Sequence, residues 1–245
     1  MASLVKRAKR AVRKKAWAGV HAVTSALPDS LRRAGGPYAR YLDMLLLDHL
    51  IFRLAFPNRH RLSDEAWRAA QPLPHQIRAL PRRGIRTVVN LRGQTSSSTY
   101  AQEVATCKAE GLELVDFRIR SRAAPTRAEL LAARDLFASV EYPILMHCKS
   151  GADRVGLMSA LYLYTRRGVP IAKARRQLSL RYGHIRQADT GILDHVFDAY
   201  LDYAARTPIE FYDWVQTVYD PDDVAKQLHS RGWANRIVDK IFRRE

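Results

Sequence analysis

The sequence predicts an α/β fold with a mostly parallel central sheet, helices on its faces, and helical N- and C-terminal extensions. Two observations predict it. Short runs of β-branched and apolar residues alternate with segments of helical periodicity in the middle of the chain, and one apolar run leads through a short glycine-containing loop into an apolar helix. The 245 residues, 47% of them hydrophobic, are enough for one domain with a sizeable core and appendages.

The predicted elements can be followed in order along the chain. The expected strands cover residues 87–91, 112–119 and 143–147. The expected helices between them cover residues 74–83, 98–111 and 126–140. After the last strand the pattern is almost entirely helical, with segments at 154–167, 170–182, 190–205 and 208–219. Because ligands bind outside the carboxyl ends of the strands in such sheets, a site is expected directly after residue 147.

The loop after that last strand has the composition of an anion site. Residues 147–156 read HCKSGADRVG. The backbone N–H groups of such a loop and of the first helical turn can converge on one bound phosphate. Cys148 lies where this positive field favours the thiolate, and Arg154 offers a planar fork that matches two phosphate oxygens. The alternative, a buried structural cysteine, would need neither the glycine nor the arginine that follow.

The other cysteine, Cys107, has Glu113 six positions later and lies in a polar helical stretch, so it is expected to be structural. Two cysteines without a secretory leader predict no disulfide framework and a reducing, cytoplasmic location. No ligand cluster in the sequence indicates a metal, and the chemistry expected of the loop requires neither a metal nor another cofactor.

Residues 1–34 form a predicted basic arm. Seven Lys and Arg residues lie between positions 6 and 15 with no acidic residue among them, and small apolar residues recur at helical spacing up to position 27. Two interpretations stay open: an amphipathic helix in peripheral contact with the inner face of an anionic membrane through residues 1–27, or a solvated basic arm.

The rest of the chain divides into three further parts. A Gly-Gly-Pro linker at 35–37 leads to an apolar block at 38–56, which is too short and too charged for a membrane span and is expected to be a packing helix. The predicted α/β domain covers residues 60–205, and a helical extension covers 206–245.

The loop motif resembles the signature of the protein tyrosine and dual-specificity phosphatase superfamily, most of all bacterial members with Asp before the loop arginine. Residues 68–72, 80–84 and 85–93 also look like the first strand, helix and second strand of that family's domain. The resemblance covers about residues 60–205. It implies a cysteine-phosphatase-like fold and hydrolysis of phosphomonoesters through a phosphocysteine intermediate.

The resemblance also implies roles for individual residues. Cys148 would be the nucleophile, Arg154 the phosphate clamp, and His147 a supporting residue that orients the loop. The phosphate-binding residues would be Lys149, Ser150, Gly151, Ala152, Asp153 and Arg154.

The proton for the leaving group has two candidate donors. Asp116 has the family's usual separation from the cysteine, but its surroundings look like strand interior, and residues 120–125 contain no acid. Asp153 is the preferred candidate, and its alternative role is an ion pair that orients the loop. Val155 occupies a position where the family commonly has Ser or Thr, which predicts slow hydrolysis of the phosphocysteine.

The net charge of +17 predicts an acidic partner. A basic strip near the loop favours multiply anionic substrates, unless it is only a solvated face: Arg118, Arg120, Arg122 and Arg127. The substrate class stays open between a phosphotyrosine or dual-specificity phosphoprotein and an anionic lipid phosphate. The alternative function is a catalytically slow phosphate-binding or scaffold protein of the same fold, and nucleic-acid binding, motivated by charge alone, is not expected.

Overall fold

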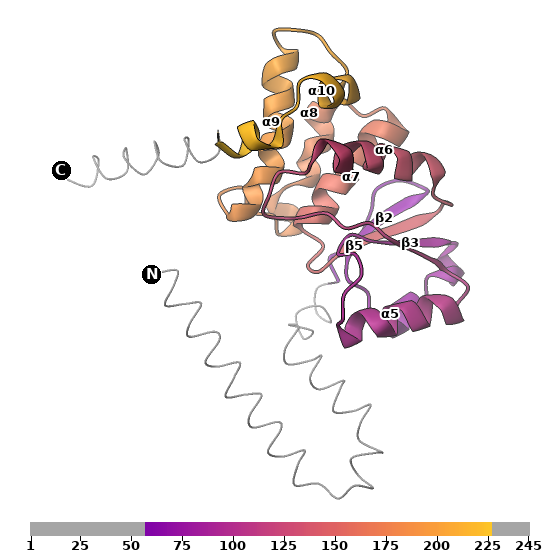
Figure 1. The fold of residues 1–245 in the computed structure, drawn as a ribbon. Coiled ribbons are helices and arrows are strands. Elements are labelled where there is room, and N and C mark those ends of the chain that lie inside the picture. The colour runs from indigo at the N-terminus through magenta and orange to yellow at the C-terminus, as the bar shows by residue number, and fades with distance from the viewer. Residues whose placement is uncertain (1–56, 227–245) are drawn as a thin grey trace, which may run out of the picture. The chain divides into compact units, whose positions relative to one another are not determined.

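The computed structural model describes residues 57–226, which form a five-stranded sheet with helices on both faces (Figure 1). The strand order is β1-β2-β5-β3-β4. The strands are β1 (His60–Arg61), β2 (Ala66–Ala70), β3 (Thr87–Asn90), β4 (Glu113–Asp116) and β5 (Ile144–Cys148). Only β1, at one edge, is antiparallel to its neighbour; the other pairs are parallel. The predicted mostly parallel α/β fold is confirmed.

The helices account for most of the remaining chain. The longer α-helices are α5 (Ser98–Ala109), α6 (Arg127–Ser139), α7 (Asp153–Arg167), α9 (Ile192–Ala204) and α10 (Phe211–Thr217). Two single-turn α-helices, α4 (Pro74–Ile77) and α8 (Ile171–Ala174), and several 3₁₀ turns complete the set. The predicted helix at 126–140 is present, and Thr126 and Glu129 form a reciprocal capping box at its start.

Alternation of side chains along the central strands separates two apolar cores. Val89 and Met146 face a large core that includes residues of α6, α7 and α9, whereas Val88 and Leu145 face a smaller core with Cys107 of α5. Figure 1 shows α5 on one side of the sheet and α6 and α7 on the other. A sheet covered on both faces explains why its strands read as nearly continuous apolar runs.

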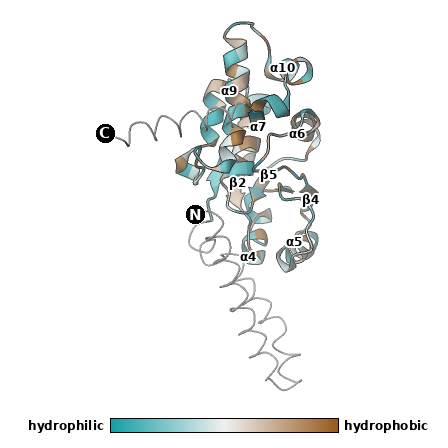
Figure 2. Ribbon diagram, turned by 60° about the vertical axis from the view of Figure 1, so that its left-hand side comes forward, coloured by the Kyte–Doolittle hydropathy of each residue, from teal (hydrophilic) through white to brown (hydrophobic). Residues whose placement is uncertain are grey.

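Helix α7 is the most buried helix next to the sheet. Its residues from Val155 to Tyr162 are all buried, and Figure 2 shows hydrophobic colouring along it. The helix ends at Gly168, whose φ of 62° is a left-handed conformation that glycine adopts without strain. Packing against the sheet therefore fixes the position of α7. The first residue of α7 comes directly after the loop that follows β5.

The structure corrects three predicted elements. The expected strand 112–119 is shorter and ends at Asp116, and the expected helix 74–83 is one α-turn followed by a 3₁₀ turn at Pro81–Arg83. The expected helix 170–182 is broken after α8 into 3₁₀ turns, because Leu178 packs against α7 at Gly156 and Ser179 is extended. This irregular segment lies beside the loop that follows Cys148.

The predicted basic arm and the predicted packing helix at 38–56 lie outside the described residues, as does the end of the C-terminal extension. Within residues 57–226, no helix combines the length and hydrophobicity needed to span a bilayer.

Candidate active site

Cys148 is the last residue of β5, and α7 begins five residues later at Asp153. The thiol is 1% exposed at the carboxyl end of the central strand. Ala152 caps α7 without a side-chain hydrogen bond, so no side chain occupies the N–H groups of the first turn. The sequence prediction of a strand, a short loop and a helix around one thiol therefore holds as a description of the backbone.

The carbonyl groups of this loop are all held from outside it. Four successive carbonyls accept hydrogen bonds: Lys149 O from Gln71 N (3.4 Å), Ser150 O from Asn58 Nδ2 (3.0 Å), and Gly151 O and Ala152 O from Arg68 Nη2 (2.8 and 3.2 Å). The donors come from β2 and from the chain just before and after it. Three anchors thus fix the peptide planes of the whole loop.

The N–H groups of the loop remain available. Among residues 57–226, no protein atom accepts a hydrogen bond from the backbone N–H of Ser150, Asp153 or the residues between them, nor of Arg154. Because the C=O and N–H of a trans peptide point in opposite directions, anchoring the carbonyls on one side turns the N–H groups to the other. Free N–H groups that converge beside a thiol form an anion site.

Gly151 is required at its position by both conformation and space. Its φ is +75°, and a Cβ atom there would lie 2.6 Å from the backbone nitrogen of Ala70. Any residue with a Cβ atom at position 151 would keep the loop from approaching β2 so closely. The close approach is what brings Arg68 within reach of the loop carbonyls.

Arg68 is a fully buried arginine in the middle of β2. Besides the two loop carbonyls, it donates through Nη1 to the backbone and side-chain oxygens of Gln177 at 2.8 and 2.7 Å, and its guanidinium lies 3.9 Å from the centre of the Tyr182 ring. Burial lowers its pKa to about 10, although Tyr182 and Cys148 act in the opposite direction. The guanidinium is therefore charged at neutral pH and ties the loop between Cys148 and α7 to the segment after α8.

Arg154 lies in the first turn of α7, half-buried, and its side chain forms no hydrogen bond or ion pair with any described residue. Its guanidinium is thus available to an anion, in contrast to that of Arg68. Lys149 is also half-buried. The four arginines of the predicted basic strip are exposed, and Arg127 donates to the carbonyl of Tyr219 at 2.7 Å.

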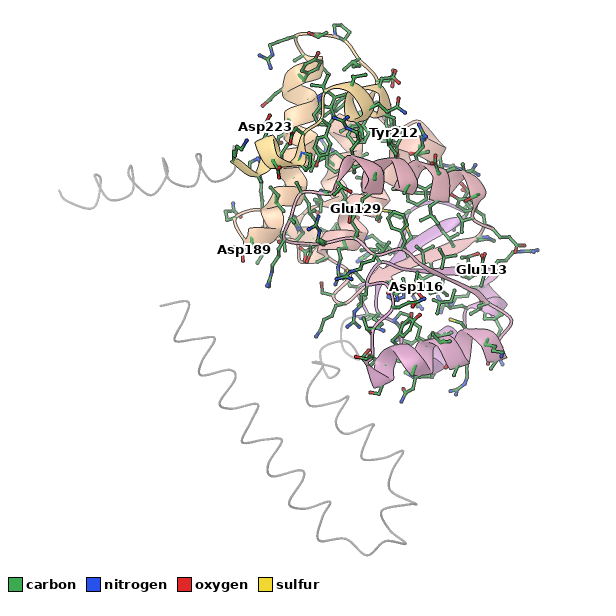
Figure 3. The ribbon with its side chains drawn as sticks, in the orientation of Figure 1. Glu113, Asp116, Glu129, Asp189, Tyr212 and Asp223 are labelled. Atoms are coloured by element: carbon green, nitrogen blue, oxygen red, sulfur yellow. The ribbon has the colours of Figure 1, made fainter. Side chains whose placement is uncertain are left out.

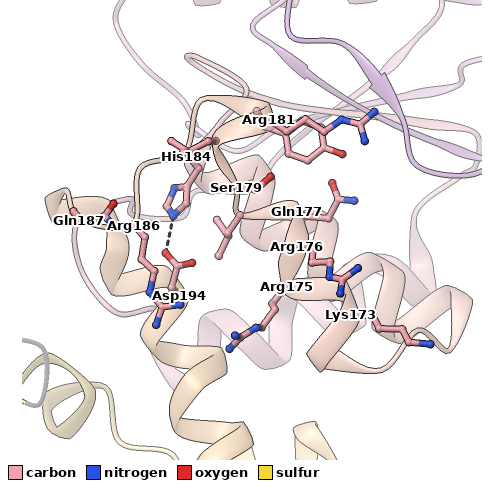
Figure 4. Close-up of a pocket in the computed structure, with 13 residues that line it drawn as sticks. Lys173, Arg175, Arg176, Gln177, Ser179, Arg181, His184, Arg186, Gln187 and Asp194 are labelled. Atoms are coloured by element: carbon pink, nitrogen blue, oxygen red, sulfur yellow. Dashed lines mark hydrogen bonds and ion pairs between the residues drawn. The ribbon is translucent and has the colours of Figure 1, made fainter.

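Asp153 is engaged by a histidine that the sequence analysis did not assign. The buried ring of His184 contacts Asp153 Oδ1 through Nδ1 at 2.7 Å and Asp194 Oδ2 through Nε2 at 2.6 Å. Figure 4 shows the contact between His184 and Asp194. Burial opposes protonation of His184, but the hydrogen bonds to the two carboxylates outweigh it and raise its pKa to about 9. Asp153 therefore lies at the end of a proton-sharing group of three side chains.

The contacts of His184 with Asp153 and Asp194 predict that the stability of the fold depends on pH. The pKa of His184 is raised from 6.5 to about 9 by folding, so its stabilising contribution is complete below about pH 6.5 and is lost as the pH rises through 9. A shift of this size corresponds to about 3 kcal/mol. Between pH 6 and 9.5, the free energy of unfolding in urea should fall by about that much more in the wild type than in His184→Gln. Equal losses in both proteins would contradict the assignment.

Asp116, the other candidate acid, is the last residue of β4 (Figure 3). Its Oδ1 accepts from Asn90 Nδ2 at 2.7 Å, and its Oδ2 accepts from the hydroxyl of Tyr100. The hydrogen bond to Asp116 is the main cause that raises the pKa of Tyr100 to about 12. Both carboxylate oxygens of Asp116 thus have donors that hold the end of β4 to β3 and α5.

His147 is completely buried on the side of the sheet that carries α5. Its Nε2 lies 2.5 Å from Glu103 Oε1, and Gln71 Nε2 donates to Glu103 Oε2 at 2.8 Å. Burial alone would raise the pKa of Glu103, but the contacts with His147 and Gln71 outweigh it and the net shift is downward. The residue before the thiol is therefore held through α5 to Gln71, whose backbone N–H anchors the loop at Lys149. The supporting role expected of His147 stays a prediction.

Sequence reasoning missed Arg68, Asn58 and Glu103 as parts of the site and assigned no role to His184, which it placed at the border of the pocket. Arg68 had a detectable signal, since an arginine inside the apolar strand AWRAA must be paired if the strand is buried. The others lie far from the motif in the chain, and only the fold brings them to it. Among the described residues, no group of three or more His, Cys, Asp or Glu side chains is arranged to hold a metal ion.

Comparisons with known proteins find one matching family model and several similar solved structures. A family model described as "DSP-PTPase phosphatase fused to NAD+ Kinase" matches residues 58–192, more than half of the chain. No curated protein matches the sequence. Similar solved structures include P. aeruginosa TpbA, with 24% identity over 61% of this chain and 91% of that chain and a TM-score of 0.48. Another is Tk-PTP in its active form, with 18% identity over 58% and 97% of the two chains and a TM-score of 0.47.

Proposed function

The chain belongs to the DSP-PTPase phosphatase family whose model it matches, and we propose that it hydrolyses phosphomonoesters by a cysteine-dependent mechanism. The observation that carries this proposal is the anchored loop. Its carbonyls are fixed by Gln71, Asn58 and Arg68, while the N–H groups of residues 150–154 have no partner among the described residues and surround the position next to Cys148. A phosphoryl group bound there would lie in line with the thiol.

The reaction proceeds in two steps. The Cys148 thiolate attacks phosphorus, the bond between phosphorus and the leaving oxygen breaks, and the leaving oxygen takes up a proton. Water then attacks the phosphocysteine, which releases inorganic phosphate and regenerates the thiolate. The loop N–H groups and the unpaired guanidinium of Arg154 stabilise the equatorial oxygens in both steps.

Asp153 is proposed as the donor of the leaving-group proton. Its Oδ1 contacts the protonated imidazole of His184, which leaves Oδ2 for the substrate. The Nδ1 proton of His184 passes to Asp153 as Asp153 gives a proton to the leaving oxygen, and solvent then reprotonates the imidazole. Both oxygens of Asp116 already accept hydrogen bonds from the protein, which disfavours that residue.

The choice of acid predicts a dependence on the leaving group. Asp153→Asn should lower kcat/KM for an alkyl phosphate by about 100-fold and leave an activated aryl phosphate nearly unchanged, because only the alkoxide needs a proton as it departs. Kinetics with a series of leaving groups measures this difference. Asp116→Asn is the control and should lower both rates equally or not at all. A uniform loss in Asp153→Asn would show that Asp153 only positions the loop.

Val155 predicts accumulation of the intermediate. Its side chain is completely buried in the apolar core, and its carbonyl accepts from the Ser159 hydroxyl at 2.6 Å, so position 155 offers no hydroxyl to the departing thiolate. With an aryl phosphate, rapid mixing should reveal a burst of about one phenolate per enzyme, followed by slower turnover. Mass spectrometry of the quenched enzyme should locate the phosphate on Cys148. A high turnover without a burst would contradict this prediction.

A phosphate-release panel tests the proposed function. It should span phosphotyrosine peptides, phosphoserine and phosphothreonine peptides, and anionic lipid phosphates in vesicles, with Cys148→Ser as the blank. Release from at least one class by the wild type alone is the expected result. Phosphate binding without release would favour the second candidate, a phosphate-binding or scaffold protein, which the buried Val155 and the fully bonded Asp116 motivate.

A further inference from the structure

The segment from Lys173 to Gln187 carries a charge pattern that the proposed reaction does not use. It contains five Lys and Arg residues and no acidic residue: Lys173, Arg175, Arg176, Arg181 and Arg186. Its backbone is irregular, with 3₁₀ turns at Arg175–Gln177 and Leu180–Tyr182. We call residues 173–187 the basic loop.

Two apolar side chains project from the basic loop. Leu180 is 76% exposed and Ile185 is 50% exposed. No other large hydrophobic residue between 57 and 226 is as exposed as these two. Each is followed directly by an arginine, Arg181 or Arg186, that is itself exposed. Exposed apolar side chains that alternate with cations are typical of surfaces that lie at a membrane interface.

The cations of the basic loop surround a hollow of about 730 Å³ (Figure 4). Arg175 and Arg186 both bind the carboxylate of Asp198, at 2.6 and 2.5 Å, so one negative charge serves two guanidinium groups. The side chains of Lys173 and Arg176 form no ion pair or hydrogen bond with any residue from 57 to 226. His184, protonated at neutral pH, also lines the hollow. Asp194 also lines the hollow and pairs with His184, so the cations outnumber the carboxylates and the surface has an excess of positive charge.

The basic loop adjoins residues 149–152, the loop that follows Cys148. Asn58 Nδ2 donates to Ser150 O at 3.0 Å and to Tyr182 O at 2.9 Å, so one amide group bridges the two segments. The ring of Tyr182 also packs on the guanidinium of Arg68, which holds the next two loop carbonyls. An anionic surface bound to the basic loop would thus lie next to the loop that follows Cys148.

We propose that the basic loop docks on an anionic phospholipid bilayer, with Leu180 and Ile185 entering the interface and the arginines binding lipid phosphates. The cations and the two exposed apolar side chains together favour a bilayer as the partner. Only a membrane interface offers an apolar layer for Leu180 and Ile185 directly beneath a dense layer of phosphates. Given the proposed phosphatase function, this contact presents a membrane-embedded lipid phosphate to Cys148. The residues of this surface are not part of the predicted basic arm at 1–34.

The experiment places a fluorescent reporter on the docking surface of the full-length protein. Leu180→Cys, Ile185→Cys and Val104→Cys are each made in a Cys148→Ser background and labelled with an environment-sensitive dye. Cys107 is buried and burial raises its pKa to about 12, so it should not react. Val104, 38% exposed on α5, is the matched control. Vesicles contain either equal phosphatidylglycerol and phosphatidylcholine or phosphatidylcholine alone.

The expected result is a blue shift of the dyes at 180 and 185 with the anionic vesicles, but none with neutral vesicles and none at 104. Cosedimentation without a shift at 180 and 185 would overturn the proposal, since another part of the chain would then carry the binding. A shift caused by a soluble acidic phosphopeptide and not by vesicles would also overturn it, in favour of a protein partner.

Catalysis is tested separately so that the two proposals can fail independently. Leu180→Ser/Ile185→Ser, with Cys148 intact, should hydrolyse p-nitrophenyl phosphate as the wild type does but should lose about tenfold in rate on a lipid phosphate held in vesicles. Equal rates of both proteins on vesicles would contradict the docking proposal. Failure of the wild type on every substrate would contradict the phosphatase function and leave the dye measurement valid.

Discussion

Replacing Cys148 with serine is expected to lower phosphate release at least about 10⁴-fold, because a serine hydroxyl is a very weak nucleophile at neutral pH. The anion site itself should persist, since the N–H groups of the loop are oriented by Gln71, Asn58 and Arg68 and not by the thiol. Titration calorimetry with inorganic phosphate should therefore give a Kd within a few-fold of that of the wild type.

Cys107→Ser is the matched control for this substitution. Cys107 is also free and buried, but it lies on α5 and faces the smaller apolar core, and burial raises its pKa to about 12. Its replacement should leave kcat/KM within about twofold, at a cost of about 1 kcal/mol in stability from burying a hydroxyl. Substantial activity in Cys148→Ser, or equal losses in the two variants, would rule out Cys148 as the nucleophile.

The sequence predicts the sheet well because strand and helix periodicities differ and both faces of the sheet are buried. The strands at Thr87–Asn90 and Ile144–Cys148 lie within one residue of their predicted bounds. The segment after α8 was predicted less well. Its apolar and basic residues continue a helical pattern, but contacts of Gln177 with Arg68 and of Leu178 with α7 break the helix. Tertiary contacts of this kind override local propensity and leave no periodic signal.

The same distinction applies to the site. The nucleophile, the glycine and the loop arginine are contiguous in the chain, so their spacing could be interpreted without a structure. The residues that orient them are 31 to 92 positions distant, as in the contacts of His184 with Asp153 and of Asn58 with Ser150. A single sequence shows that such residues are polar but does not show what they face.

Arg68→Met is expected to have the second largest effect. The substitution leaves the carbonyls of Gly151 and Ala152 without their donor inside a buried strand-loop contact, and it also removes the two bonds to Gln177. Loss of a buried charged donor from several acceptors typically costs about 3–5 kcal/mol. Urea denaturation should measure this loss. Because those carbonyls orient the loop N–H groups, kcat/KM should also fall by about 100-fold or more under conditions where the variant is folded.

Arg61→Met is the matched control in the adjacent strand. Arg61 is exposed, lies 5.4 Å from the centre of the Trp67 ring, and donates to Ser63 O at 2.8 Å, so its loss should cost about 1 kcal/mol or less and leave kcat/KM unchanged. Arg68→Lys separates charge from geometry. A lysine retains the positive charge but cannot span Gly151, Ala152 and Gln177 with one planar fork, so it should restore stability only in part and activity little. If Arg68→Met instead bound phosphate and turned over substrate as the wild type does, Arg68 would not be needed to orient the loop N–H groups. Anchoring of the loop carbonyls by Arg68 would then no longer support the proposed mechanism.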